Sequence, residues 1–148
     1  MKKILFLDID GVLAGFNWLK NRKNGGDFLD PELVQKLNIL DYDIVISSSC
    51  GCDDGLTEKK LRQKGLKLPI IGYTEHFEIG YDWIVRGNSI KKWLCDNMGN
   101  TNFQYVIVDD DSDMLLEQKE HFVQTNIETG ITDENIKKIS QILNSDIL

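Results

Sequence analysis

The sequence is poor in residues that mark several classes of protein. Its 148 residues include two prolines, three cysteines and two histidines. An odd number of cysteines without an export signal argues against a disulfide framework. The apolar run near the N-terminus is short and is interrupted by Asp8 and Asp10, so it resembles neither a signal peptide nor a membrane span. We therefore expect a cytoplasmic protein without membrane contact.

The sequence also lacks an excess of positive charge. Its net charge of -7 and its pI near 4.8 argue against a protein that coats nucleic acid or anionic membrane by bulk electrostatics. One basic cluster, at Lys20, Arg22 and Lys23, is expected in a loop, as either a phosphate contact or a solvated surface. A content of 41% hydrophobic and 28% charged residues is typical of a globular domain, which we assign to residues 1–148. No sequence feature indicates a stable protein partner.

Short runs rich in Ile and Val predict strands, and helical patterns lie between them. Continuous apolar runs of about four to eight residues are typical of parallel strands buried on both faces. The alternation predicts an α/β fold, with a doubly wound, Rossmann-like parallel sheet of about five strands and helices on both faces. The expected strands are 4–9, 43–46, 69–71, 104–108 and 121–124, and the expected helices are 31–40, 55–64, 88–98 and one capped by Thr132.

The segment FLDIDGVL at 6–13 places two carboxylates two residues apart where a strand ends. Side chains alternate along a strand, so Asp8 and Asp10 point the same way while the backbone stays extended, and Gly11 permits a sharp turn. Two acids in one cleft need a cation or a shared proton. The pattern therefore favours a magnesium-dependent phosphoryl-transfer enzyme over a binding module.

Several segments together resemble the haloacid dehalogenase-like (HAD) superfamily, whose members are mostly phosphatases. DxDGV from Asp8 resembles its first motif, IVISSS at 44–49 its second, and VIVDDDSD at 106–113 its fourth, in the same order. More narrowly, the serines together with 71–74, 86–94 and 129–132 resemble small HAD domains linked with nucleic-acid end repair and nucleotide dephosphorylation. The resemblance spans nearly the whole chain and implies a phosphoric monoester hydrolase.

The resemblance implies a two-step reaction at the DxD pair. Asp8 is the expected nucleophile, which attacks phosphorus and forms an aspartyl-phosphate. Asp10 is the expected acid and base, which protonates the leaving oxygen and then activates water. Its pKa should therefore lie above that of metal-bound Asp8.

The late acidic segment is expected to complete a magnesium site. Asp109 directly follows a strand and is expected to bind Mg²⁺ together with Asp8 and the backbone carbonyl of Asp10. Asp110 and Asp113 are expected to hold the waters of the ion. Mg²⁺ is therefore the expected cofactor.

A transferring phosphoryl group also needs hydrogen-bond donors and a cation. Ser48 occupies the position of the hydroxyl in the second motif, with Ser47 and Ser49 as neighbours that can contribute. Arg86 is the expected cation of the third motif, placed to neutralise phosphate charge, and Lys91 is its substitute.

The segments between the motifs are too short for a large cap domain. The resemblance therefore implies a capless enzyme with an open cleft, whose partner is a phosphorylated substrate such as a nucleotide or a polynucleotide end. The loop from Tyr73 to Gly87 carries Tyr81 and Trp83 and is expected to serve as a small lid or a base-stacking surface.

Three alternatives stay open at the level of the sequence. In the first, one Asp of the DxD pair caps the turn, and Asp111 or Ser112 caps the next helix. In the second, the chain is a receiver-like phosphoacceptor module, although the order of its acidic segments argues against this. In the third, it is a catalytically inactive interaction protein with the HAD fold.

Overall fold

The computed structural model describes residues 1–22, 26–48, 55–76, 78–79, 82–83 and 85–145. At its centre is a five-stranded parallel sheet with the order β3-β2-β1-β6-β7. All five strands lie close to the predicted positions, so this part of the prediction is confirmed. The strands are β1 (Lys2–Leu7), β2 (Asp43–Ile46), β3 (Ile70–Tyr73), β6 (Phe103–Asp109) and β7 (Phe122–Gln124).

The central strand β1 is buried on both faces. Ile4, Leu5, Phe6 and Leu7 are all fully buried. Leu5 and Leu7 belong to one layer of the core and Ile4 and Phe6 to the other, because side chains alternate along a strand. Burial on both sides is the reason that this strand is a continuous apolar run in the sequence.

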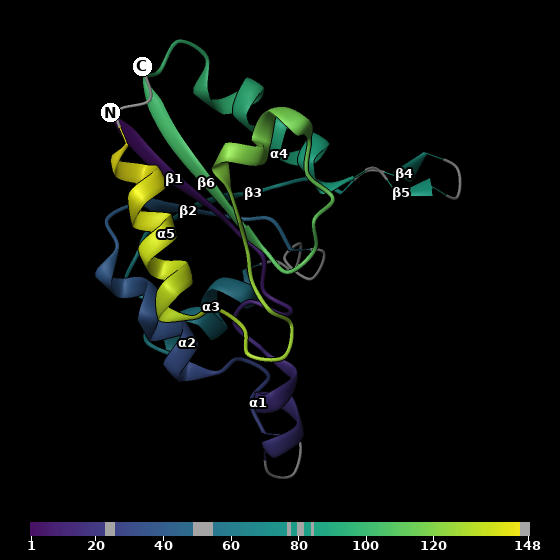
Figure 1. Ribbon diagram of the computed structural model, residues 1–148, viewed down its shortest axis with the longest axis vertical. Helices are drawn as coiled ribbons and strands as arrows, with labels where there is room; N and C mark the ends of the chain where they lie inside the picture. Colours follow the sequence, from purple (N-terminus) through teal and green to yellow (C-terminus); the bar gives the residue numbers. More distant parts are fainter. Residues whose placement is uncertain (23–25, 49–54, 77, 80–81, 84, 146–148) are drawn as a thin grey trace.

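Helices cover both faces of the sheet (Figure 1). Val34, Leu61 and Ile139 come from three helices on the face of Leu5, whereas Ile90 comes from a helix on the opposite face. The doubly wound α/β architecture is therefore confirmed. The α-helices on the first face are α2 (Pro31–Lys36), α3 (Leu56–Gln63) and α5 (Asp133–Asn144), and the helix on the second is α4 (Arg86–Met98).

The predicted caps begin two of these helices. Asp30 accepts a hydrogen bond of 3.0 Å from the backbone N–H of Glu32, ahead of Pro31 at the first position of α2. The α-helix is shorter than predicted, because the chain tightens into a 3₁₀ helix, η1 (Leu37–Ile39), after Lys36. Thr132 caps α5, and its hydroxyl accepts from the N–H of Asn135 at 3.2 Å.

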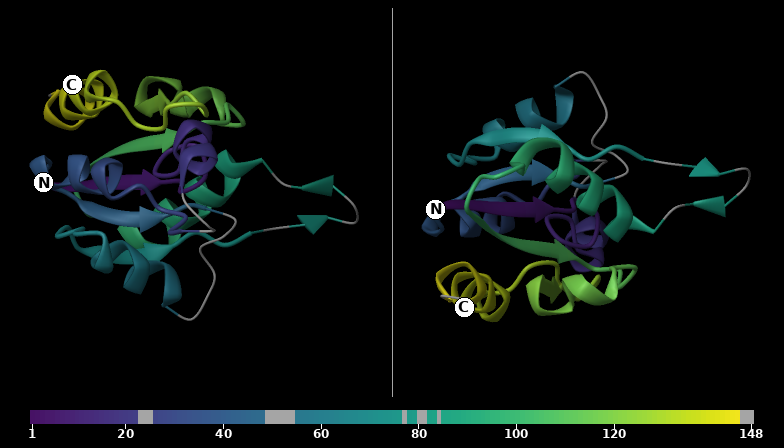
Figure 2. Two further views of the ribbon diagram at one scale, coloured as in Figure 1. Left: turned by 90° about the horizontal axis from the view of Figure 1, so that it is seen from below. Right: turned by 90° about the horizontal axis from the view of Figure 1, so that it is seen from above.

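Four short elements were not expected from the sequence. The hairpin of β4 and β5 projects from the body between β3 and α4 (Figure 2), and it is the only insertion there among the described residues. The helix that follows β6 begins after Leu115, so a cap at Asp111 or Ser112 is wrong. The four elements are α1 (Phe16–Asn21), β4 (Glu78–Ile79), β5 (Asp82–Trp83) and the 3₁₀ helix η2 (Leu116–His121).

The strand order reverses between β1 and β6. The chain builds β1, β2 and β3 toward one side of the sheet and then returns to place β6 and β7 on the other. In open parallel sheets, ligands bind at the carboxyl ends of the strands that flank such a reversal. Among the described residues, every helix is too short or too polar to span a membrane.

Candidate metal and phosphate site

Three carboxylates meet at the carboxyl ends of β1 and β6. One oxygen from each of Asp8, Asp109 and Asp110 lies within 4.8 Å of the other two. Asp8 and Asp109 are buried, with 4% and 0% of their surface exposed, whereas Asp110 is half-buried. Residues that are about a hundred positions apart in the chain are thus brought together, as the order of the motifs predicts.

Pairing of the two central strands positions the first two carboxylates. Leu7 of β1 lies opposite Val108 of β6, and the N–H of Asp8 donates to the carbonyl of Val108 at 3.0 Å. Asp8 therefore leaves β1 at the level where Asp109 ends β6. The side chain of Asp109 is fixed further by the N–H of Asp111, which donates to its Oδ1 at 3.0 Å.

The turn at Gly11 makes room for the third carboxylate. Gly11 has a φ of +71°, and a Cβ at this position would lie 2.5 Å from Cγ of Asp110. Glycine is therefore needed here both for the backbone conformation and for the space. The glycine of the DxDG segment thus determines where an acid from the other motif can lie.

Arg86 is the cation beside the cluster. It is the first residue of α4, its Nε lies 3.0 Å from Oδ2 of Asp109, and its Nη1 lies 3.4 Å from Oδ1 of Asp8. The backbone N–H of Arg86 donates to Oδ2 of Asp113 at 2.9 Å, which ties the start of α4 to the acidic segment. Lys91, the substitute suggested by the sequence, instead pairs with Glu117 at 2.8 Å on the surface.

Burial and mutual repulsion favour a proton on the two buried acids. Burial raises the pKa of Asp8 to about 6 and that of Asp109 to about 8. The neighbouring Asp8 and Asp110 also raise the pKa of Asp109, whereas the charge of Arg86 lowers both pKa values. One guanidinium therefore does not balance three carboxylates, and a cation would remove the imbalance.

The cluster fits a magnesium ion. All three side chains offer oxygen, which Mg²⁺ prefers, and one oxygen from each lies within 4.8 Å of the other two. Oδ2 of Asp109 is buried and faces Arg86, but among the described residues it accepts no hydrogen bond. A buried carboxylate oxygen normally has such a bond, so this atom is suited to an ion.

Ser48 and Asp10 flank the cluster in different ways. Ser48 is buried, its side chain hydrogen-bonds Asp8, and its carbonyl lies 2.9 Å from Nε2 of His76. Asp10 is exposed, and its backbone forms a bridge with Ala14. The carboxylate of Asp10 is not part of the cluster of described residues, so its proposed role depends on a substrate that reaches outward from Asp8.

Several sequence predictions fall outside the described residues. These are the predictions for Ser49 and Tyr81, as well as the Lys23 part of the basic cluster. Lys20 of that cluster pairs with Glu128 at 3.9 Å on the surface, which fits the solvated alternative.

Sequence reasoning missed two residues that support the site. Asp113 binds the N–H of Arg86 through Oδ2, a contact that the sequence did not indicate. His76 contacts the carbonyl of Ser48 through Nε2. Neither contact could be predicted from the sequence, because each joins two segments that are far apart in the chain and are brought together only by the fold.

A family comparison agrees with this geometry. The sequence model of the HAD domain in Swiss Army Knife RNA repair proteins matches residues 4–136, a range that contains Asp8, Arg86 and Asp109. Neither the curated proteins nor the solved structures gave a match. The matched range covers the sheet and every residue of the carboxylate cluster. The chain therefore belongs to the family of HAD domains found in Swiss Army Knife RNA repair proteins.

Proposed function

We propose that the protein is a Mg²⁺-dependent phosphatase that hydrolyses a phosphomonoester of a nucleotide or of an RNA end. The observation that carries the proposal is the convergence of Asp8, Asp109 and Asp110 beside Arg86 at the edge of the sheet. HAD domains are commonly hydrolases, and the matched family is described by RNA repair. Both facts support phosphate chemistry on nucleic acid.

The residues present suit both the metal and the phosphate. Asp8, Asp109 and Asp110 would hold Mg²⁺, which supplies positive charge to the phosphate oxygens when bound. Arg86 adds a second positive charge on the side of α4, and the Ser48 hydroxyl adds a hydrogen-bond donor. A phosphate above Asp8 is therefore surrounded by groups that stabilise negative charge.

The proposed reaction has two displacements at phosphorus. In the first, an oxygen of Asp8 bonds to phosphorus, the ester P–O bond breaks, and Asp10 gives its proton to the leaving oxygen. In the second, Asp10 takes a proton from water as the water oxygen attacks phosphorus. The bond to Asp8 then breaks, and inorganic phosphate leaves. Asp8 must be ionised to attack, and the nearby Arg86 favours the ionised form.

The test is release of inorganic phosphate from nucleoside monophosphates, phosphorylated RNA oligonucleotides and 4-nitrophenyl phosphate. We expect EDTA to abolish release and Asp8→Asn to lower kcat by at least about a thousandfold, because the nucleophile is lost. Asp41→Asn, an exposed acid between η1 and β2, is the matched control and should keep full activity.

Two results would contradict the proposal. Activity that survives both EDTA and Asp8→Asn would refute the mechanism. Stable phosphorylation of the protein by acetyl phosphate, with no phosphate released from any substrate, would favour the receiver-like alternative instead.

A further inference from the structure

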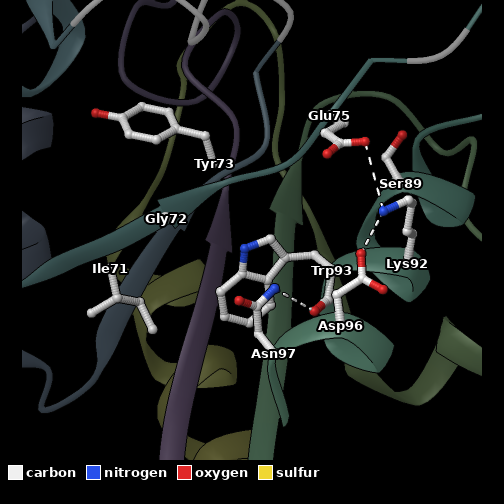
Figure 3. A pocket seen from close by; sticks show the side chains of 9 residues that line it. All are labelled: Ile71, Gly72, Tyr73, Glu75, Ser89, Lys92, Trp93, Asp96 and Asn97. Carbon is white, nitrogen blue, oxygen red and sulfur yellow. Dashed lines mark hydrogen bonds and ion pairs between the residues drawn. The ribbon is translucent and has the colours of Figure 1, made fainter. Parts of the chain in front are cut away.

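A cavity of about 260 Å³ lies between β3 and α4 (Figure 3). It exists because the sheet is wider than the helix that covers it. Ile90 and Trp93 of α4 pack against the middle of the sheet, whereas β3 is the outermost strand on that side. The space beside β3 is lined by one face of α4, by the strand itself and by Glu75.

Both walls of the cavity continue into the carboxylate cluster. Ser89, which lines the cavity, lies one helical turn after Arg86 on α4. On the other wall, Glu75 precedes His76, which contacts the carbonyl of Ser48 at 2.9 Å. Trp93 lies seven residues beyond Arg86, about 10 Å along the helix axis. A phosphate at Asp8 can therefore belong to a molecule whose next group enters the cavity.

The indole ring of Trp93 forms part of the cavity wall beside Gly72. A Cβ at Gly72 would lie 2.9 Å from Nε1 of Trp93 and 3.3 Å from Cζ2, so glycine lets the strand pack closely against this edge of the ring. The ring is held by an edge-on contact with Phe6, with a centroid distance of 5.5 Å. A flat aromatic ligand can thus contact a rigid aromatic surface.

The indole N–H of Trp93 has no hydrogen-bond partner among the described residues. Trp93 is 9% exposed, but its Nε1 is not among the buried polar atoms that lack a partner, so this N–H is accessible. Trp18 differs, because its Nε1 donates to the carbonyl of Phe28 at 3.0 Å. The N–H of Trp93, which lines the cavity, is therefore available to an acceptor on a ligand.

The opposite side of the cavity presents acceptors. The carboxylates of Glu75 and Asp96 both pair with the ammonium of Lys92, which lies between them (Figure 3). Each carboxylate can accept several hydrogen bonds, so pairing with Lys92 leaves acceptor capacity on both. Asn97 donates its amide N–H to the carbonyl of Trp93 at 2.9 Å, which leaves its side-chain oxygen as another acceptor.

We propose that this cavity binds a guanine base of the substrate whose phosphate reacts at Asp8. The inference rests on the proposed function and names the substrate class more narrowly. Guanine has adjacent N1–H and N2–H donors, which match one carboxylate, and O6 and N7 acceptors, which match the indole N–H of Trp93. Adenine and cytosine place an acceptor next to their amino group, and a carboxylate repels it.

The test compares kcat/KM for guanosine, inosine and uridine monophosphates, each as the 3′ and the 5′ phosphate. Inosine differs from guanosine only in lacking the 2-amino group. We expect guanosine to exceed inosine by about tenfold, because a hydrogen bond to a charged acceptor is lost. In the double variant Glu75→Gln with Asp96→Asn, the guanosine-to-inosine ratio should fall below about twofold.

Cys95→Ser is the matched control, because Cys95 is the exposed neighbour of Asp96 on α4 and does not line the cavity. It should keep the ratio of the parent protein. The ratio cancels any general effect on the catalytic centre. Equal kcat/KM for guanosine and inosine in the parent protein, or a ratio that the double variant leaves unchanged, would overturn the assignment.

The same measurements separate this inference from the proposed function and identify the source of the base. If 4-nitrophenyl phosphate, all nucleotides and the phosphorylated RNA oligonucleotides stay intact, the phosphatase proposal fails. The affinities for guanosine and inosine monophosphates, measured by calorimetry, then test whether the cavity binds guanine. Tighter binding of the guanosine nucleotide supports the assignment, and equal binding refutes it. A further pair of RNA oligonucleotides that end in phosphorylated guanosine or inosine shows whether the base belongs to a free nucleotide or to an RNA end.

Discussion

Gly11, in the DxDG segment, determines where Asp110 of the late acidic segment can lie. Its φ of +71° is one that L side chains rarely adopt, and its missing side chain leaves the space that the carboxylate of Asp110 fills. A side chain at Gly11 would have two effects: it would strain the backbone, and it would take the space of the Asp110 carboxylate. A second glycine with a similar φ but free space around it allows an experiment to separate them.

We predict that Gly11→Ala weakens Mg²⁺ binding by at least about tenfold and lowers the free energy of unfolding by at least about 1 kcal/mol. The Cβ would force the carboxylate of Asp110 out of the cluster, since the gap to its Cγ is only 2.5 Å. Calorimetric titration with Mg²⁺ and urea unfolding measure the two effects.

Gly55→Ala is the control. Gly55 has a φ of +83°, and a Cβ there meets nothing within 4 Å. This variant should lose comparable stability and keep the parent affinity for Mg²⁺. Unchanged Mg²⁺ affinity in Gly11→Ala would show that Asp110 is not held by this contact.

The raised pKa values of Asp8 and Asp109 predict how stability depends on pH without metal. An acid whose pKa rises on folding takes up protons as the chain folds, so its contribution to stability is greatest below about pH 4 and is lost as the pH rises through about 6 to 8. We expect Asp8→Asn to make the metal-free protein more stable than the parent at pH 8, with little difference below about pH 4. Urea unfolding in EDTA at several pH values measures this, and parallel pH profiles for the two proteins would contradict it.

Single residues were predictable from the sequence where a motif fixes them locally. The positions of Asp8 and Asp109 follow from the strands that precede them, because the carboxyl ends of parallel strands meet at one edge. The sequence did not show whether Arg86 or Lys91 lies beside the acids. That choice depends on where α4 begins, and α4 begins at Arg86 because Asp113 binds its backbone N–H.

At the scale of elements, η2 fixes the start of α4. Gln118 of η2 is buried, its Nε2 donates to the carbonyl of Gly87 at 2.9 Å, and its Oε1 accepts from the N–H of Leu115 at 2.9 Å. A Cβ at Gly87 would lie 2.5 Å from Oε1 of Gln118, so the two elements are in close contact. The position of Arg86 therefore depends on a segment outside the motifs.

We predict that Gln118→Met lowers the free energy of unfolding by about 1 to 3 kcal/mol, because the carbonyl of Gly87 and the partly buried N–H of Leu115 both lose a hydrogen bond to the side chain. It should also lower kcat, since the first turn of α4 carries Arg86. Urea unfolding and phosphate release measure the two effects.

Glu117→Gln is the matched control, because Glu117 is the adjacent residue and makes only an exposed pair with Lys91. It should change the free energy of unfolding by less than about 0.5 kcal/mol. A loss in Glu117→Gln as large as that in Gln118→Met would show that the buried hydrogen bonds are not the cause.

Helices and strands with many buried residues were the easiest to predict, because burial leaves an apolar pattern in the sequence. The strands β1, β2 and β6 were found because they are buried on both faces, and α5 because its apolar stripe follows a Thr cap. α1 has no buried residue and no side-chain cap, so nothing in its six residues signals a helix. The strands β4 and β5 have two residues each, too few for an alternating pattern.

At the scale of the whole molecule, the unbalanced acids make stability depend on a cation. A ligand that binds only the folded state stabilises it by about 2.7 kcal/mol at a hundred times its Kd. We therefore expect Mg²⁺ at that concentration to raise the Tm at pH 8 by about 5 to 10 °C. Thermal unfolding with Mg²⁺ and with EDTA measures the shift. It should be much smaller in Asp8→Asn, and an equal shift in that variant would place the ion elsewhere.

The two ends of the described chain meet on the side of the molecule away from the carboxylates. Lys3, at the start of β1, donates through Nζ to Oδ1 of Asn144, at the end of α5, at 2.6 Å, and the acids lie where β1 ends (Figure 1). Any tether attached near either end therefore emerges on the side of the molecule away from the carboxylate cluster. A domain immobilised or fused through either end would therefore keep the carboxylate cluster facing away from the point of attachment. A short linker that joins the two ends, with new ends opened in a loop, would give a circular permutant with the same sheet.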